Sequence, residues 1–196
     1  MRIVLYSVII IILIISLGGC GSSVYVPTTS TTQLDDKYSD TDLRVMAQTM
    51  YQSIMDRLST VRGDNKKTPV IAFLRVSNKT SEYIDTDAIA DKLQIQLIKA
   101  GSLRFVDRSR IKDITGQFDL GASGIMNPES MKKAGKVLGN DYFLVGDLSS
   151  IAKQDRSTSL TYYRLSMRLI DAETDEIIWA DESEVKKQKN KNIFDW

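Results

Sequence analysis

The spacing of apolar and polar positions changes from helical to strand-like along the chain. After residue 39, apolar side chains recur every three or four positions, which predicts an amphipathic helix that ends near Gly63. The run Val70 to Val76 is almost wholly apolar, as is typical of a central strand covered on two sides. Two more helices are predicted, from about Asp85 to Gly101 and from Asp107, with a short strand over 103–106 between them.

In the last third of the chain the period falls from 3.6 to 2. A final helix is predicted from Pro128 to Gly139, followed by a strand over 142–148. Leu165, Met167 and Leu169 then alternate with polar residues, and a turn leads to a returning strand from 177 to about 187. We therefore predict an α/β (α+β) sandwich with one mixed β-sheet, flanking helices and a long C-terminal antiparallel hairpin.

The N-terminus has the features of a signal peptide. A short basic end precedes the apolar run Ile3 to Leu17, which is shorter than the roughly 20 residues that span a bilayer as a helix. Leu17-Gly18-Gly19-Cys20 resembles the lipobox of bacterial lipoproteins, in which the leader is cut off immediately before the cysteine and acyl chains are attached to that cysteine. Since Cys20 is the only cysteine and has no disulfide partner within the chain, we expect it to carry a lipid; an uncleaved membrane anchor is the alternative.

These features divide the chain into four segments. We expect a signal peptide over 1–19, a lipidated flexible tether rich in Ser and Thr over 20–38, a globular domain over 39–191 and a C-terminal tail over 192–196. Such a tether reaches at most roughly 60 Å. An aspartate directly after the acylated cysteine commonly marks retention in the inner membrane, but here Gly21 and Ser22 follow Cys20. We therefore expect a lipid anchor on the periplasmic face of the outer membrane.

Composition argues against catalysis and against several ligand classes. The chain has no histidine, and its one cysteine is assigned to the lipid, so we expect no catalytic triad and no metal site. No phosphate-binding glycine motif is present, and 26 basic against 25 acidic residues give a net charge of +1. We therefore expect no enzyme activity, cofactor, small-molecule substrate or nucleic acid; glycan hydrolysis by paired carboxylates is a remote alternative.

Several short segments, in this order, resemble the LpoB family of penicillin-binding protein activators. They are DTDLR (40–44), TPVI (68–71), NKTSEYIDT (78–86), FVD (105–107), LIDAET (169–174) and IIW (177–179). The resemblance implies a domain similar to the N-terminal domain of TolB and to CsgG-like proteins. It also implies an outer-membrane lipoprotein that binds a class A penicillin-binding protein and stimulates its glycan polymerisation and cross-linking, although this tether is shorter than that of the best-known members.

The resemblance and the strand order suggest one contact site. Asn78, Thr80, Ser81 and Asp85 form a polar loop after a central strand, so we expect them to bind the partner; turn and helix-cap chemistry is the alternative explanation. The lysines 186, 187, 189 and 191 are expected to form a solvated basic end. A structural subunit of a CsgG-like envelope or secretion complex is the alternative function, but the pattern leaves no spare amphipathic strands for a pore.

Overall fold

The chain divides into two compact units, Met1–Thr31 and Thr32–Trp196. The computed structural model describes residues 26–27, 30, 36–61, 68–117 and 128–190. In the first unit, the carbonyl of Pro27 accepts hydrogen bonds from the Ser30 amide at 3.0 Å and the Ser30 hydroxyl at 2.7 Å. The predicted signal peptide, Cys20, most of the predicted tether and the tail 192–196 lie outside the described residues.

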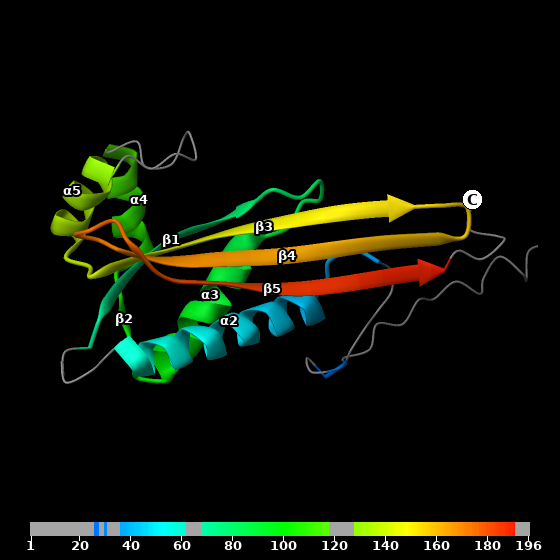
Figure 1. The fold of residues 1–196 in the computed structure, drawn as a ribbon, viewed down its shortest axis with the longest axis horizontal. Helices are drawn as coiled ribbons and strands as arrows, with labels where there is room; N and C mark the ends of the chain where they lie inside the picture. The colour runs from blue at the N-terminus through cyan, green and yellow to red at the C-terminus, as the bar shows by residue number, and fades with distance from the viewer. Residues whose placement is uncertain (1–25, 28–29, 31–35, 62–67, 118–127, 191–196) are drawn as a thin grey trace, which may run out of the picture. The chain divides into compact units, whose positions relative to one another are not determined.

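The described part of the second unit contains four helices and five strands. The helices are α2 (Asp40–Val61), α3 (Thr86–Lys99), α4 (Arg108–Gln117) and α5 (Pro128–Leu138). The strands are β1 (Val70–Asn78), β2 (Arg104–Phe105), β3 (Tyr142–Gln154), β4 (Thr158–Asp171) and β5 (Ile177–Asn190). They form one open sheet in the order β2-β1-β3-β4-β5, with β5 at one edge (Figure 1).

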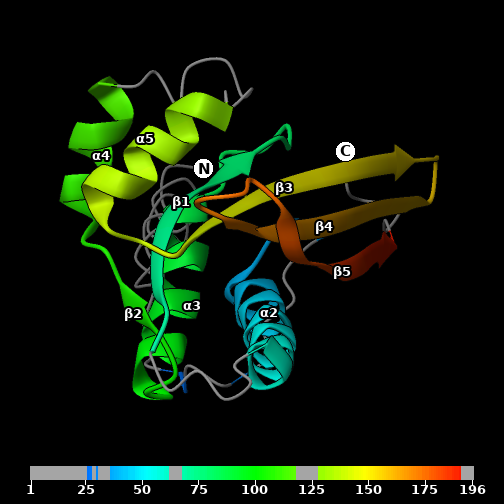
Figure 2. The same cartoon turned by 60° about the vertical axis from the view of Figure 1, so that its left-hand side comes forward.

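The sheet is mixed, as predicted. Strand β1 runs parallel to both β2 and β3, whereas β4 is antiparallel to both β3 and β5. Helices α2 and α3 lie against one face of this sheet (Figure 2). The predicted α+β class and the C-terminal hairpin are confirmed.

The larger core lies between the sheet and helices α2 and α3. Helix α2 contributes the side chains at four-residue spacing that the apolar pattern predicted: Met46, Met50, Ile54 and Leu58, none more than 4% exposed. Asp85 caps the first turn of α3 by accepting from the amides of Asp87 and Ala88, and Gly101, with φ of 66°, follows its last turn. These two predicted helix ends are confirmed.

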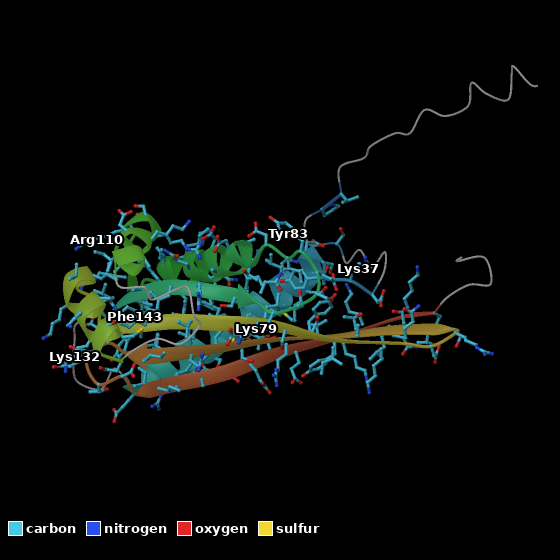
Figure 3. The ribbon with its side chains drawn as sticks, turned by 90° about the horizontal axis from the view of Figure 1, so that it is seen from above. Lys37, Lys79, Tyr83, Arg110, Lys132 and Phe143 are labelled. Carbon is cyan, nitrogen blue, oxygen red and sulfur yellow. The ribbon has the colours of Figure 1, made fainter. Side chains whose placement is uncertain are left out.

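Helices α4 and α5 cover only one end of the opposite face. Phe143, Val145 and Ile170 are buried beneath them, and Figure 3 shows Phe143 among the helices that carry Arg110 and Lys132. A Cβ on Gly135 would lie 3.0 Å from the Ala172 Cβ, so α5 packs closely onto the sheet. Beyond Val145 this side of β3, β4 and β5 is largely exposed, and we call it the open sheet face.

The hairpin strands extend further than the sequence pattern predicted. Strand β3 continues to Gln154 and β5 to Asn190, rather than ending near residues 148 and 187. The added part of β3 has Ile151 and Ala152 among polar residues, and that of β5 is wholly polar, so no regular apolar alternation marks them. The backbone pairing of Gln154 with Ser159 and of Thr158 with Asn190 extends the ladders.

Residues 36–39 span the predicted boundary between tether and domain. They contact the far ends of β4 and β5, and we call them the N-terminal clasp. Asp36 accepts hydrogen bonds from the hydroxyls of Ser159 and Thr161. The Ser159 hydrogen bond lowers the pKa of the Asp36 carboxyl below its usual value. The clasp therefore joins the chain before α2 to the hairpin.

A buried ion pair completes the clasp. The side chain of Lys187 is 3% exposed, and its Nζ lies 3.0 Å from Asp42 Oδ2 and also donates to the Lys37 carbonyl. The same Asp42 oxygen accepts from the Ser39 amide at 2.7 Å and the Ser39 hydroxyl at 2.8 Å, as in a helix capping box. The prediction that Lys187 belongs to a solvated basic end is therefore wrong: it faces inward, where α2 begins.

Candidate functional site

The loop from Asn78 to Asp85 joins β1 to α3 and is held by hydrogen bonds within itself. Asn78 Nδ2 donates to the carbonyls of Glu82 at 2.9 Å and Ile84 at 3.4 Å, so one side chain spans the loop. Asn78 Oδ1 accepts from the Thr80 amide at 2.9 Å. The two ends of the loop are therefore tied together by a single amide group.

Thr80 adds a second set of bonds across the loop. Its hydroxyl lies 2.8 Å from Asn78 Oδ1 and 3.1 Å from the Glu82 carbonyl, and donates its one hydrogen to either acceptor. The same hydroxyl accepts from the Glu82 amide at 3.1 Å. Ile84, which is 8% exposed, anchors the loop in the larger core.

Tyr83 projects from this loop into solvent. Its relative exposure is 101%, the highest among the exposed large hydrophobic residues of the described part of the chain, and Figure 3 shows it at the outer surface. Its neighbour Glu82 points the other way, because its carboxylate accepts a hydrogen bond from the buried hydroxyl of Tyr163. Burial, together with this bond, raises the pKa of Tyr163 far above its usual range.

A line of charged residues connects the loop to the open sheet face. Lys79 Nζ lies 3.0 Å from one carboxylate oxygen of Asp147, and the Arg168 guanidinium lies 3.8 Å from the other. We call the loop 78–85 together with Asp147 and Arg168 the Tyr83 surface. It combines an aromatic ring with both signs of charge, as protein interfaces commonly do.

The rest of the open sheet face carries further polar pairs across β4 and β5. Arg164 lies 3.8 Å from Glu182, and the Tyr162 hydroxyl donates to Glu184. This hydrogen bond raises the pKa of Tyr162 above its usual value. Glu182 therefore lies beside an arginine of the neighbouring strand, whereas Glu184 bonds to a tyrosine.

A shallow groove lies between α2 and α3 in the described structure. It encloses about 440 Å³ and is lined by Arg44, Val45, Gln48, Thr49, Lys92 and Gln96. The Thr49 hydroxyl donates to the Val45 carbonyl of its own helix, and no carboxylate lies in the lining. The Thr49 hydroxyl is therefore committed to its own helix.

The described residues contain neither a cluster suited to a metal ion nor a helix suited to spanning a membrane. Within the described ranges, no group of three or more His, Cys, Asp or Glu side chains is arranged to hold a metal ion. Among the helices of those ranges, none is both long enough and apolar enough to cross a membrane.

The four predicted contact residues lie together in the loop, but the side chains of three of them form hydrogen bonds within the loop or at the start of α3. Asn78 and Thr80 tie the loop, Asp85 caps α3, and Ser81 is exposed beside Tyr83. Sequence reasoning passed over Tyr83, although an aromatic residue in a polar loop was visible there. No sequence signal marked Glu82, whose partner Tyr163 lies 81 positions away.

We expect Asn78→Ala to loosen this loop without unfolding the domain. The substitution removes both carbonyl partners of Nδ2 and the acceptor for the Thr80 amide, and each lost bond contributes about 1 kcal/mol. Hydrogen exchange should then be faster at residues 79–84, with little change in α3. Asn78→Asp keeps the acceptor oxygen and should give an intermediate result; unchanged exchange in Asn78→Ala would contradict this account.

The chain is similar to several solved structures. The LpoB C-terminal domain from Salmonella enterica has a TM-score of 0.48 and 18% identity, covering 68% of this chain and 96% of that chain. The Escherichia coli LpoB C-terminal domain has a TM-score of 0.48 and 19% identity, covering 69% and 96%. A lipoprotein from Neisseria meningitidis, GNA1162, has a TM-score of 0.47 and 16% identity, covering 64% and 88%.

Sequence comparison identifies the family. Among curated proteins, none gives a significant match to the chain. Among protein families, the one described as peptidoglycan-synthase activator LpoB matches residues 42–185, a span that begins in the first turn of α2 and ends in β5. Since this match covers most of the chain, the chain belongs to the peptidoglycan-synthase activator LpoB family.

Proposed function

We propose that this protein binds a class A penicillin-binding protein and activates it by contact through the Tyr83 surface. Membership of the family implies the role of a peptidoglycan-synthase activator, a regulator rather than a catalyst. The alternative of a structural subunit in a CsgG-like complex is not favoured by that assignment. The class of synthase and the contact surface are the parts that we propose here.

The observation that carries the proposal is a fully exposed tyrosine on a loop that is already ordered. Tyrosine supplies a large apolar area and one hydroxyl at low cost in conformational entropy, and is enriched among residues that dominate binding energy. The hydrogen bonds of Asn78 and Thr80 fix the loop before any partner arrives, so less ordering is needed on binding.

Activation by contact requires a preference between two states of the synthase. A ligand that binds the active and inactive states equally shifts no population, however tightly it binds. We therefore expect the Tyr83 surface to fit the active synthase better than the idle one. The lysine, aspartate and arginine beside the loop offer charges of both signs that can discriminate between the two states.

We further propose that a lipid on Cys20 anchors the protein to the periplasmic face of the outer membrane. Family members are envelope lipoproteins, and the lipobox-like residues before Cys20 support cleavage and acylation there. Mass spectrometry of the purified full chain should find residues 1–19 removed and acyl chains on Cys20. A Cys20→Ser variant should lose both changes; an uncleaved wild-type chain would contradict the anchor.

The activation itself is tested by adding the full chain, purified in detergent, to class A synthases of the same organism. We expect the rate of lipid II polymerisation to rise with at least one of them, in step with binding. Absence of both binding and stimulation for every class A synthase would overturn the proposal. Release of soluble fragments from purified cell-wall sacculi by the protein alone would instead reveal a hydrolase.

A further inference from the structure

The side chain of Tyr163 connects two segments that are far apart in the sequence. Tyr163 lies on β4, is fully buried, and donates its hydroxyl hydrogen to the Glu82 carboxylate in the loop. The ring of Tyr38 packs edge-on against the ring of Tyr163, with centroids 5.6 Å apart and planes at 69°. The backbone of Tyr38 partly offsets the rise in the pKa of the Tyr163 hydroxyl.

Tyr38 lies within the clasp, and its neighbours on both sides are held by hydrogen bonds. Before it, Asp36 bonds to β4 and the Lys37 carbonyl accepts from Lys187; after it, Ser39 bonds to Asp42 at the start of α2. The position of the Tyr38 ring is therefore set by contacts to α2, β4 and β5. The ring in turn limits where Tyr163, and with it Glu82, can lie.

Glu82 links the position of Tyr163 to that of the exposed Tyr83. Its backbone amide and carbonyl both bond within the loop, to Thr80 and Asn78, and it directly precedes Tyr83. The Glu82 side chain therefore ties the backbone that carries Tyr83 to Tyr163. One continuous series of contacts runs from the clasp to the Tyr83 surface.

We propose that Tyr38 and Tyr163 are positioning residues for partner binding, because their stacked rings and the Tyr163–Glu82 hydrogen bond hold the Tyr83 loop in its binding position. This inference rests on the proposed function and adds to it two residues outside the contact surface. Since Tyr163 is fully buried, it cannot touch a folded partner. Any effect of its hydroxyl on affinity must pass through Glu82 and the loop.

The two tyrosines offer matched substitutions that separate this role from general stability. Tyr163→Phe removes only the hydroxyl that holds Glu82. Tyr38→Phe keeps the stacked ring and removes a buried hydroxyl that has no hydrogen-bond partner in the described structure, so it should leave the loop unchanged. Tyr38→Ala removes the ring. Tyr162→Phe is the control for Tyr163, since its hydroxyl also bonds to a carboxylate but lies on the open sheet face.

The first measurement is hydrogen exchange of the full chain alone, at a temperature where every variant is folded. Because Tyr163→Phe removes a hydrogen bond to a charged group, it should make exchange at residues 79–84 at least about tenfold faster. Tyr38→Ala should act in the same direction, and Tyr38→Phe and Tyr162→Phe should match the wild type. Wild-type loop exchange in Tyr163→Phe would overturn the inference whether or not any synthase binds.

The second measurement is the affinity of the same variants for a synthase that the wild type binds. We expect Tyr163→Phe and Tyr38→Ala to bind severalfold more weakly, and Glu82→Gln, which keeps an acceptor oxygen for Tyr163, to bind nearly as the wild type does. Faster loop exchange with unchanged affinity would also overturn the positioning role. A wild type that binds no class A synthase would instead refute the proposed function and leave the exchange result to stand on its own.

Discussion

Replacing Lys187 with methionine is expected to lower the free energy of unfolding by about 3–5 kcal/mol, the usual loss when one partner of a buried ion pair is removed. The side chains of Lys187 and Asp42 are 3% and 6% exposed, so the Asp42 carboxylate would stay buried without its cation. The Lys37 carbonyl would also lose its donor. Urea unfolding followed by circular dichroism measures the change.

A neighbouring lysine provides the control. Lys186 is exposed on the opposite side of β5, so Lys186→Met should change stability by less than about 0.5 kcal/mol. The double variant Asp42→Asn/Lys187→Met removes both charges while Asn can still accept from Ser39, so it should recover part of the loss. Equal stability of the two single lysine variants would show that the pair is not buried in solution.

Replacing Tyr83 with alanine is expected to abolish most of the binding to the synthase while leaving the fold intact. Residues at the centre of an interface often contribute at least 2 kcal/mol, which corresponds to a loss of affinity of roughly thirtyfold. Because Tyr83 is fully exposed and Glu82 holds the loop independently, stability should change by less than about 0.5 kcal/mol. Binding assays and lipid II polymerisation, run in parallel with urea unfolding, separate the two effects.

Two further substitutions define the contribution of Tyr83. Tyr83→Phe keeps the ring, so it shows whether the hydroxyl takes part in recognition. Ile151→Ala removes an apolar side chain that is 59% exposed at the far end of β3, outside the Tyr83 surface, and should leave affinity unchanged. If Tyr83→Ala binds and stimulates like the wild type, the contact surface lies elsewhere on the domain.

The sequence predicted those parts of the fold that local spacing determines. Periodic apolar residues located α2 and α3, and the capping residue Asp85 and the left-handed Gly101 marked the ends of α3. The alternation of Leu165, Met167 and Leu169 located β4, where all three are buried. Such signals lie within one turn or one strand, so they can be read without knowing what packs against them.

The missed features depend on contacts between distant segments. Lys187 sits among other lysines, and only the approach of Asp42, 145 positions earlier, makes it a buried residue. Tyr163 fits a strand pattern, but its bond to Glu82 cannot be inferred from spacing. The same holds for the candidate site: the loop was correctly located, whereas the exposure of Tyr83 became evident only once its neighbours were placed.

Strand β5 lies at an open edge of the sheet, which affects how closely copies of the protein can be packed without aggregating. It is an edge strand of 14 residues, and a free edge of that length can pair with another sheet and start aggregation. Acidic and basic residues occupy most of its second half, and Lys187 points inward, a combination that makes the addition of another strand costly. Many copies held side by side by the proposed lipid anchor can therefore remain separate and keep their Tyr83 surfaces accessible.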